Sequence, residues 1–423
     1  MRRRDLLAGL PALGLAGLLP GLARGQDAVR EHKFLFIVAY GGWDITSVFA
    51  PSADNPAVDT ELDAVTAELG DLRFVDHPGR PAVRRFFETW GDQACILNGL
   101  EVRSVTHEAC ERILLTGSSA AAGDDWASVL AAHSTNDLAL AHLVVAGSAL
   151  TQEHVSQVVR VGSRGQLLDL LDGNALIQSG HLTTALPNDV HARIDAAVAE
   201  RVAAVANGAS PSGRRFGAGY DRALQDLATL EGLAGDLQLQ AEGTGCGRDA
   251  AEDAGIVLDA FERGLSRCGM VEDDGWCGEG WDTHNSGVLQ STNFELLFGY
   301  LDRILGDLAL RPSPSGGALA DEVTVVVLSE MGRHPQINDS GGRDHWTYTS
   351  AMLLGAGVRG GQVIGELDED FQGRPVDLVT GEARDDGTGL VPGHLGATLL
   401  ALGGVDPGDV LTGGEGVIEA ALA

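Results

Sequence analysis

The segment SEMGRHPQINDSGGRDHW (329–346) concentrates side chains that can bind a metal ion or transfer protons. It follows the run EVTVVVL (322–328), whose apolar, β-branched residues predict a buried strand. Glu330 comes directly after that run, and Asp344 and His345 follow the glycine pair 341–342. Such a density of carboxylate and imidazole donors at a strand end is typical of a metal site. A polar loop is the alternative.

Further donors follow other strand-like or extended segments. Asp44 lies in GGWDITSVFAP, after the first apolar run. Asp282 and His284 lie in GWDTHNS, and their spacing of two puts both side chains on one side of an extended segment. Thr106 and His107 stand at the start of a predicted helix, with Ser104 just before them. Four separate strand ends therefore each offer an Asp, Glu or His.

These donors predict a divalent transition metal. Mixed Asp, Glu and His ligands favour zinc, manganese or iron over calcium. One ion, or two ions about 4 Å apart, would polarise an ester oxygen and lower the pKa of a water or hydroxyl nucleophile. Arg333 and Arg343 flank the opening segment and could hold an anionic group bidentately, with surface arginines that balance local acid as the alternative.

The elements that must position these residues indicate an α/β protein. Runs of strand length that are apolar on both faces occur at 33–40, 94–100, 139–147, 322–328 and 350–357. Helical periodicity occurs at 107–115, 190–206, 219–240, 251–266, 291–309 and 395–402. Doubly buried strands alternating with helices predict a three-layer α/β/α sandwich around a mostly parallel sheet. In such sheets ligands bind at the carboxyl ends of the strands.

The chain of 423 residues is expected to form one large domain after an N-terminal signal. Residues 1–25 combine three arginines, a short Gly- and Pro-containing apolar stretch and small residues, which predicts an export signal of the twin-arginine type. The twin-arginine export machinery is then a partner, and the mature chain, 26–423, is periplasmic or secreted. No later segment predicts a stable membrane span. Strand signals fade at about 150–275, which we interpret as a helical insertion.

Charge and composition exclude some functions. The formal net charge is −31 at pH 7, so nucleic acid is not expected as a partner. Lys33 is the only lysine and has no glycine-rich loop around it, which argues against a P-loop or a Schiff base. The five cysteines permit two disulfides and one spare thiol in an exported protein, and none has zinc-ribbon spacing.

Several motifs, in order along the chain, resemble an uncharacterised exported family, domain of unknown function 1501. They are FIVAYGGWDITSVFAP, SVTHEACERILLTGS, GWDTH, VVVLSEMGRHPQINDSGGRDHW and MLLGAGVRGGQVIGE. That family is in turn similar to the alkaline phosphatase and sulfatase superfamily. The resemblance implies an alkaline phosphatase-like fold, and it places Asp44, Asp282, His284 and Glu330 where metal ligands belong. Asp344 and His345 are the candidates to complete the set.

The departures from this pattern bear on catalysis. Met331 stands where the superfamily has a histidine ligand, and His334 stands where the family has a threonine. His107 occupies the place of the nucleophile, which leaves Thr106, Ser104, a metal-bound water or His107 itself as alternatives. The chain has no Cys-x-Pro-x-Arg, which argues against a formylglycine sulfatase.

Two hypotheses follow. The first is an exported metal-dependent hydrolase of a small anionic ester, a phosphate or related ester, with Thr106, His107 and Arg343 in catalytic roles. The second is a non-catalytic exported binding or structural protein that keeps the fold and a metal ion. Metal content and activity on ester substrates discriminate between them.

Overall fold

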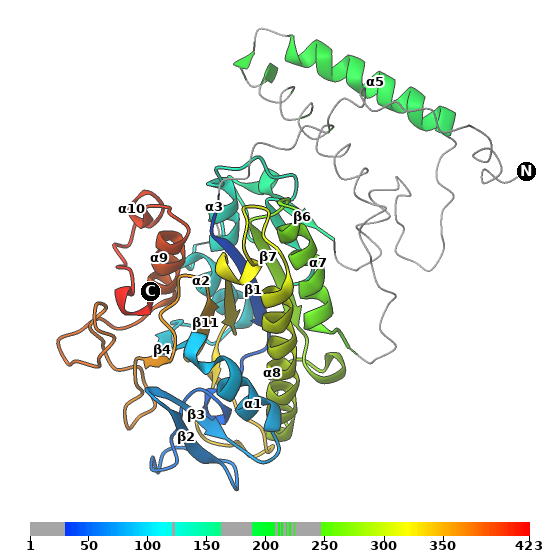
Figure 1. Cartoon of the computed structure of the whole chain (residues 1–423). Helices are drawn as coiled ribbons and strands as arrows, with labels where there is room; N and C mark the ends of the chain where they lie inside the picture. The colour runs from blue at the N-terminus through cyan, green and yellow to red at the C-terminus, as the bar shows by residue number, and fades with distance from the viewer. Residues whose placement is uncertain are drawn as a thin grey trace, which may run out of the picture.

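The computed structural model describes residues 30–120, 123–161, 188–207, single positions between 210 and 224, and 247–423. The predicted signal (1–25) and most of the predicted helix 219–240 lie outside the described residues. Figure 1 shows a central sheet covered by helices, with a small two-stranded sheet beside it. The strands are β1 (Lys33–Ala39), β2 (Val65–Leu69), β3 (Leu72–Asp76), β4 (Ala94–Glu101), β5 (His142–Val144), β6 (Val158–Arg160), β7 (Cys268–Asp273), β8 (Val323–Leu328), β9 (Gly332–Arg333), β10 (His345–Trp346), β11 (Tyr348–Gly355) and β12 (Gln362–Ile364). The helices are α1 (Pro81–Trp90), α2 (His107–Thr116), α3 (Trp126–Ala132), α5 (Asn188–Ala206), α7 (Ala250–Glu262), α8 (Gly287–Leu310), α9 (Pro392–Leu402) and α10 (Pro407–Val410).

The central sheet has eight strands in the order β12-β4-β11-β8-β1-β7-β5-β6. Strand β1 pairs in parallel with β7 on one side and with β8 on the other. Strand β11 runs antiparallel to both of its neighbours, β4 and β8. The sheet is therefore mostly parallel, as predicted, and β11 is the exception.

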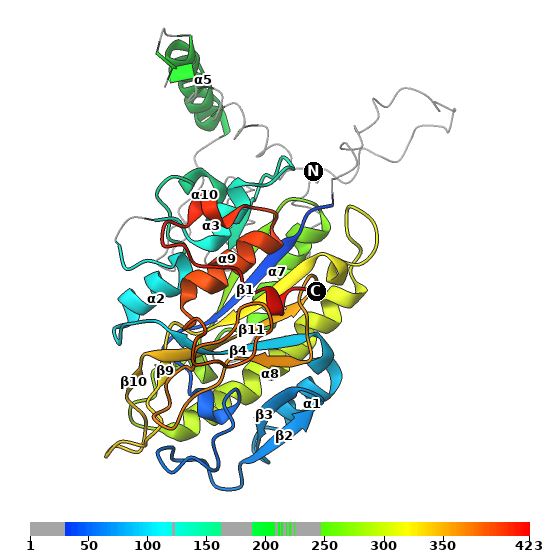
Figure 2. The ribbon, with the colours of Figure 1, turned by 90° about the vertical axis from the view of Figure 1, so that its left-hand side faces the viewer.

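Helices cover both faces of this sheet, which confirms the α/β class. In β1 the side chains alternate: Leu35 and Ile37 belong to one buried cluster, and Phe34 and Phe36 belong to the other. The first cluster includes apolar residues of α1, α7 and α8, and the second includes those of α2, α3 and α9. Figure 2 shows α2, α3 and α9 on the opposite side of the sheet from α1 and α8. Burial on both faces explains why β1 is apolar throughout.

The segments that carry the candidate site residues lie at one edge of the sheet, because the strands before them are parallel. Strands β1, β4, β7 and β8 point the same way, so the segments that follow them leave from the same edge of the sheet. Strand β11 begins at this edge because it is antiparallel, and β10 lies immediately before it. The Asp, Glu and His residues singled out in the sequence thus come from segments that share one edge.

The part of the chain predicted as a helical insertion, about 150–275, is described only in pieces. These pieces are β6, α5, α7 and β7. Strand β7 lies in the centre of the sheet, between β1 and β5, and was not among the predicted strands. Among the described residues, no helix is both long enough and apolar enough to cross a membrane.

The cysteines do not form the two disulfides that their number permits. Cys95, Cys110 and Cys268 are free and buried, whereas Cys277 is disulfide-bonded. Burial raises the pKa of the Cys95 thiol to about 12, so this group is held as an unreactive thiol. With three of five cysteines free, one intrachain disulfide at most remains.

Candidate metal site

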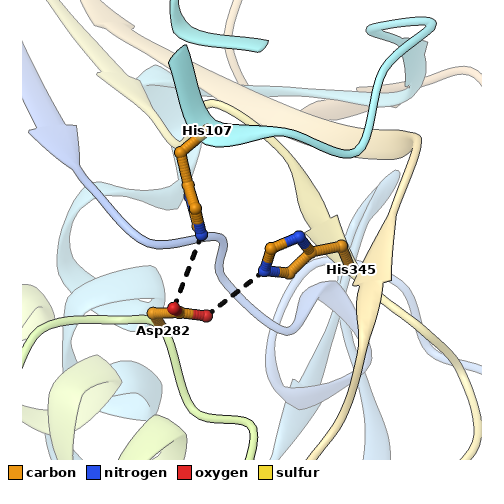
Figure 3. A group of neighbouring side chains, drawn as sticks. All are labelled: His107, Asp282 and His345. Carbon is orange, nitrogen blue, oxygen red and sulfur yellow. Dashed lines mark hydrogen bonds and ion pairs between the residues drawn. The ribbon is translucent and has the colours of Figure 1, made fainter. Parts of the chain in front are cut away.

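Three histidines and one aspartate meet at the edge of the sheet just described. We call His107, Asp282, His284 and His345 the cradle. His107 Nε2 lies 3.5 Å from Asp282 Oδ2, and His345 Nε2 lies 3.3 Å from Asp282 Oδ1. His284 Nε2 lies 3.2 Å from Asp282 Oδ1 and 2.9 Å from His345 Nε2. Figure 3 shows His107 and His345 directed at the same carboxylate from different segments.

Each cradle residue comes from a segment that the sheet topology fixes. His107 is the first residue of α2, whose last turn ends at Gly117 in a left-handed conformation (φ 71°). Asp282 and His284 follow β7 after a short 3₁₀ turn at Trp276–Gly278. His345 begins β10, which pairs with β9, where Arg333 stands opposite it. Asp282 and His284 share one segment, and the other cradle residues come from segments far apart in the sequence.

The inner nitrogen of each histidine is held by an acceptor. His107 Nδ1 lies 2.7 Å from Glu330 Oε1, and His345 Nδ1 lies 2.7 Å from the carbonyl oxygen of Val105. His284 Nδ1 lies 3.2 Å from Asp344 Oδ1. Because these oxygens can only accept, each Nδ1 carries the hydrogen and donates it, and each Nε2 is left with a lone pair in the neutral imidazole. This is the arrangement in which histidine binds metals through Nε2.

The cradle as it stands concentrates negative potential at one point. Three nitrogen lone pairs lie within 3.5 Å of the ionised carboxylate of Asp282, and His107 Nε2 is buried without a hydrogen-bond partner. Two Nε2 lone pairs only 2.9 Å apart repel each other unless a proton or a cation lies between them. The hydrogen bond with Glu330 raises the pKa of His107, against the lowering effect of burial. The site therefore favours a positive charge.

The donor set fits a single metal ion. Ligands placed tetrahedrally at about 2.0–2.1 Å from zinc lie about 3.3 Å apart. The separations within the cradle range from 2.9 Å to 3.5 Å for the four pairs given above. His107, Asp282 and His345 alone offer ligand atoms that all lie within 4.8 Å of one another. A small ion can be bound here with only small movements of the side chains.

Arg333 holds the aspartate of the cradle in place. Its buried guanidinium donates to Asp282 Oδ1 and to the carbonyl oxygens of Gly41 and Gly42. Burial raises the pKa of Asp282, but the hydrogen bond and the charge of Arg333 outweigh it, so the pKa lies below its usual value. Asp282 is thus kept ionised. Arg333 was predicted as a residue that binds an anionic substrate, but here it is buried and already paired.

Glu330, predicted as a ligand, lies behind His107 rather than in the cradle. Its carboxylate accepts hydrogen bonds from the amides of Gly41 (2.9 Å) and Gly42 (3.3 Å) and from Ser329 Oγ (3.2 Å). Together with the 2.7 Å contact to His107 Nδ1, these donors use both of its oxygens. Asp344, also predicted as a ligand, lies behind His284, and its pKa is lowered by hydrogen bonds from Asn338 first and His284 second.

Asp44 and Arg343, predicted as a metal ligand and an anion clamp, pair with each other outside the cradle. Arg343 Nε lies 2.9 Å from Asp44 Oδ2, and both side chains are about nine-tenths buried or more. Arg343 also donates to the carbonyl oxygens of His334 (3.0 Å), Pro335 and Asp59. Asp44 further accepts from Thr46 and so starts the 3₁₀ turn at Ile45–Ser47. These contacts are structural.

The remaining predicted residues lie around the cradle. Thr106 Oγ1 lies 3.3 Å from Ser104 Oγ, and both residues are at the exposed start of α2. Met331 is fully buried against Val102 and Cys110. His334 packs edge-on against Trp346, with ring centroids 4.9 Å apart, and its Nδ1 accepts from the amide of Gln336. Sequence reasoning did not anticipate the Val105 carbonyl as the partner of His345, since a backbone acceptor leaves no mark in the sequence.

A cavity of about 1180 Å³ lies elsewhere in the molecule. It is lined by residues 49–57, by parts of 363–374 and by a few residues of β2, β3 and β4. None of its lining residues belongs to the cradle. The two sites are therefore distinct.

Comparison with known protein families gives a match over part of the chain. Residues 260–416 match the family described as "Protein of unknown function (DUF1501)". This match contains Asp282, His284 and His345, and it confirms the resemblance drawn from the motifs in this part of the chain. No protein in the curated set matches the chain in sequence.

Several solved structures, a sulfatase among them, share a distant likeness with this chain. PsFucS1 sulfatase from Pseudoalteromonas sp. is 12% identical, with 93% of this chain and 72% of that chain covered and a TM-score of 0.34. Ps i-CgsB in complex with k-i-k-neocarrahexaose is 10% identical, with 88% and 72% covered and a TM-score of 0.35. A Bacteroides thetaiotaomicron protein of glycosaminoglycan metabolism is 9% identical, with 92% and 75% covered and a TM-score of 0.35. At these TM-scores the likeness adds nothing to the fold assignment, which follows from the sheet topology.

Proposed function

We propose that this protein is an exported, metal-dependent hydrolase of phosphate or related anionic esters, sulfate esters included. One observation carries the proposal: donor atoms of His107, Asp282 and His345 lie within 4.8 Å of one another, His284 Nε2 lies beside Asp282 and His345, and each histidine has its other nitrogen held by an acceptor. Supporting groups of this kind orient ligands toward a metal ion and raise their basicity. Export rests on the predicted signal.

The donor set indicates which metal is bound. Three imidazoles and one carboxylate suit zinc, manganese or iron, whereas calcium and magnesium prefer sets made of oxygen atoms. His107, His284, His345 and Asp282 would hold the ion. An ion bound there would polarise the ester and lower the pKa of a water molecule.

The residues of the chain supply the rest of the chemistry. The ester binds with its charged end at the start of α2, where the first amides of the helix lack partners within the helix and favour an anion. Thr106 and Ser104 expose hydroxyl groups there, and these donate hydrogen bonds to the ester oxygens. In the reaction the oxygen of one water molecule forms a bond to the phosphorus or sulfur atom, and the bond from that atom to the alcohol oxygen breaks. The alcohol leaves with one proton of the water, and the other water proton stays with the phosphate or sulfate product or passes to solvent.

A second function has a specific observation in its favour. His284 lies beside Asp282 and His345, and its binding as a fourth ligand would fill a tetrahedral ion. Closed sites of this kind are usually structural, whereas catalytic sites keep a position open. The alternative is thus an exported binding protein whose metal ion ties α2 to the segments that follow β7 and precede β11. In that case the ion contributes to stability and the ester is not turned over.

The test compares metal content with turnover. The mature protein is purified, its bound metals are measured by mass spectrometry, and activity is assayed on chromogenic phosphate monoesters, phosphate diesters and sulfate esters. His345→Ala should remove the bound metal and the activity. His334→Ala is the matched control, because His334 lies in the neighbouring segment and outside the cradle, and it should keep the metal.

The outcomes separate the hypotheses. Metal that is lost in H345A and kept in H334A, together with turnover of any ester in the wild type, supports the hydrolase. Full metal loading without turnover favours the binding protein. A wild-type protein that purifies without metal and does not bind added zinc or manganese excludes both.

A further inference from the structure

We propose that the cradle binds one ion and not two, and that the ester it accepts carries a single negative charge. This inference rests on the proposed function and deepens it. It follows from two features of the described residues: the carboxylates around the cradle already have hydrogen-bond or ion-pair partners within the chain, and the charges at the site cancel once one divalent ion is bound.

Asp44 was the other predicted aspartate ligand outside the cradle, and it is already paired with Arg343. The 2.9 Å contact between Arg343 Nε and Asp44 Oδ2 is buried on both sides. The other oxygen of Asp44 accepts from the amide and the hydroxyl of Thr46. An arginine guanidinium stays protonated at any physiological pH, so Asp44 always has a positively charged partner. Asp44 therefore has no free charge for a metal ion.

Both oxygens of Glu330 and one oxygen of Asp344 already accept hydrogen bonds. Glu330 accepts from two backbone amides, one hydroxyl and His107 Nδ1, which accounts for the lone pairs of both of its oxygens. Asp344 Oδ1 accepts from His284 and from Asn338. At Glu330 a second ion would have to displace these donors and leave the buried amides of Gly41 and Gly42 without partners, which is costly. The exposed carboxylate of Asp344 would then be the only carboxylate left among the three, which is too few donors for a second site. The cradle is therefore expected to hold a single ion.

The charge at the site follows from these contacts. The ion brings two positive charges and the guanidinium of Arg333 brings a third. Three carboxylates face them: Asp282 in the cradle, Glu330 behind His107 and Asp344 behind His284. The histidines are neutral when they bind a metal through Nε2. One divalent ion thus brings the site to zero net charge.

A neutral site selects for the charge of the ester. A phosphate monoester carries close to two negative charges above pH 7, because its second pKa is about 6. Sulfate monoesters and phosphate diesters carry one. The second charge of a monoester would approach Glu330 and Asp344 without a second cation to neutralise it, in a molecule whose net charge is already −31. The substrate class is therefore the monoanionic ester.

Metal stoichiometry tests the first half of the proposal. Wild-type protein loaded with zinc and desalted should contain one equivalent by mass spectrometry. Asp44→Asn should also contain one, whereas Asp282→Asn, the same substitution within the cradle, should bind zinc at least about tenfold more weakly. Two equivalents in the wild type, or loss of zinc in D44N with an unchanged melting temperature, would overturn the single-ion assignment. A D44N protein that does not fold is replaced by Arg343→Gln with the same readout.

Binding of small anions tests the second half without requiring turnover. Calorimetric titrations of the zinc protein at pH 8 compare dimethyl phosphate and methyl sulfate, both monoanions, with methyl phosphate, a dianion. We expect both monoanions to bind about tenfold more tightly than the dianion. Equal or tighter binding of methyl phosphate overturns the proposal, and so does the absence of binding by all three. In either case a protein that holds zinc and hydrolyses an ester still satisfies the proposed function.

Discussion

The carboxylates near the cradle differ in role because their hydrogen-bond partners differ. Asp282 has Arg333 behind it and three imidazoles in front of it, so it stays ionised and available to a cation. Glu330 is more deeply buried, and its oxygens are used by amides, a hydroxyl and His107. The residue type alone does not separate these roles. What separates them is whether a free lone pair remains.

Asp273 gives a pH-dependent prediction at the residue scale. It ends β7, its Oδ2 is buried without a hydrogen-bond partner, and its Oδ1 accepts from the amide of Gly275. Burial raises its pKa from 3.8 to about 7, with the Gly275 amide acting in the opposite direction. The folded state therefore holds this proton up to a higher pH than the unfolded state does. Stability from this group is full below about pH 4 and is lost as the pH rises through 7.

Asp273→Asn should remove this dependence, because an amide is neutral at every pH. We expect the free energy of unfolding of D273N, relative to the wild type, to rise by about 3 kcal/mol between pH 4.5 and pH 8. Urea titrations of both proteins in EDTA at the two pH values measure it. A difference between the two proteins that is the same at both pH values would contradict the raised pKa.

At the scale of elements, the turn after β1 locks the cradle to the sheet. Gly41 has φ +121°, and a Cβ there would lie 2.4 Å from the backbone nitrogen of Asp282 and 2.7 Å from the backbone carbon of Trp281. Its amide donates to Glu330, and its carbonyl accepts from Arg333. A side chain at this position would therefore push the segment of Asp282 away from the turn.

Gly41→Ala is expected to destabilise the fold by about 2–4 kcal/mol, from the clash and the unfavourable φ together. The shift of Asp282 should also weaken zinc binding. Denaturant titration and zinc competition with a chelator measure the two effects. Gly306→Ala in α8 is the matched control: a Cβ there meets nothing within 4 Å, so this helix position should gain about 0.5–1 kcal/mol. If G41A is as stable as the wild type, the close approach is not essential.

Strands were predicted correctly where both of their faces are buried, because such strands are apolar at every position. Strands β1, β4, β8 and β11 are continuous apolar runs, and all of them were predicted. Strand β7 reads CGMVED, and its Gly269 lies against Val257, so close packing there replaced an apolar side chain by glycine. A short strand with a glycine and two acidic residues does not stand out by periodicity. The apolar pattern of β11 likewise does not predict that this strand runs antiparallel to its neighbours.

The sequence predicted where the candidate site lies, but it did not predict which contacts each residue makes there. Convergence of donors at strand ends predicted that Asp282, His284 and His345 lie near one another. His107 was predicted in a catalytic role, and Glu330 and Asp44 as ligands. The structure instead places Glu330 behind His107 and pairs Asp44 with Arg343. The positions of Glu330 and Asp44 depend on contacts with residues more than 200 positions away along the chain. Such contacts cannot be predicted from the spacing of residues in one sequence.

At the scale of the whole molecule, charge sets the conditions for stability. The chain has 60 acidic and 29 basic residues other than histidine, so at least half of the carboxylates have no cationic partner of their own. Net charge this far from zero keeps a protein soluble and destabilises the compact state through repulsion between like charges. Some pairs, such as Lys33 with Glu322 at 2.6 Å, are buried and only weakly screened by salt.

Added salt should therefore stabilise this protein. Salt screens the long-range repulsion among exposed carboxylates, because the Debye length falls from about 10 Å at 0.1 M to about 3 Å at 1 M. It also weakens exposed ion pairs such as Arg73 with Glu68, but such pairs contribute about 0–1 kcal/mol each. Repulsion then dominates, and the melting temperature in sodium chloride should rise by at least a few degrees between 0.05 M and 1 M. Chloride is used because sulfate also strengthens apolar burial. A melting temperature that falls with sodium chloride would show that the ion pairs outweigh the repulsion.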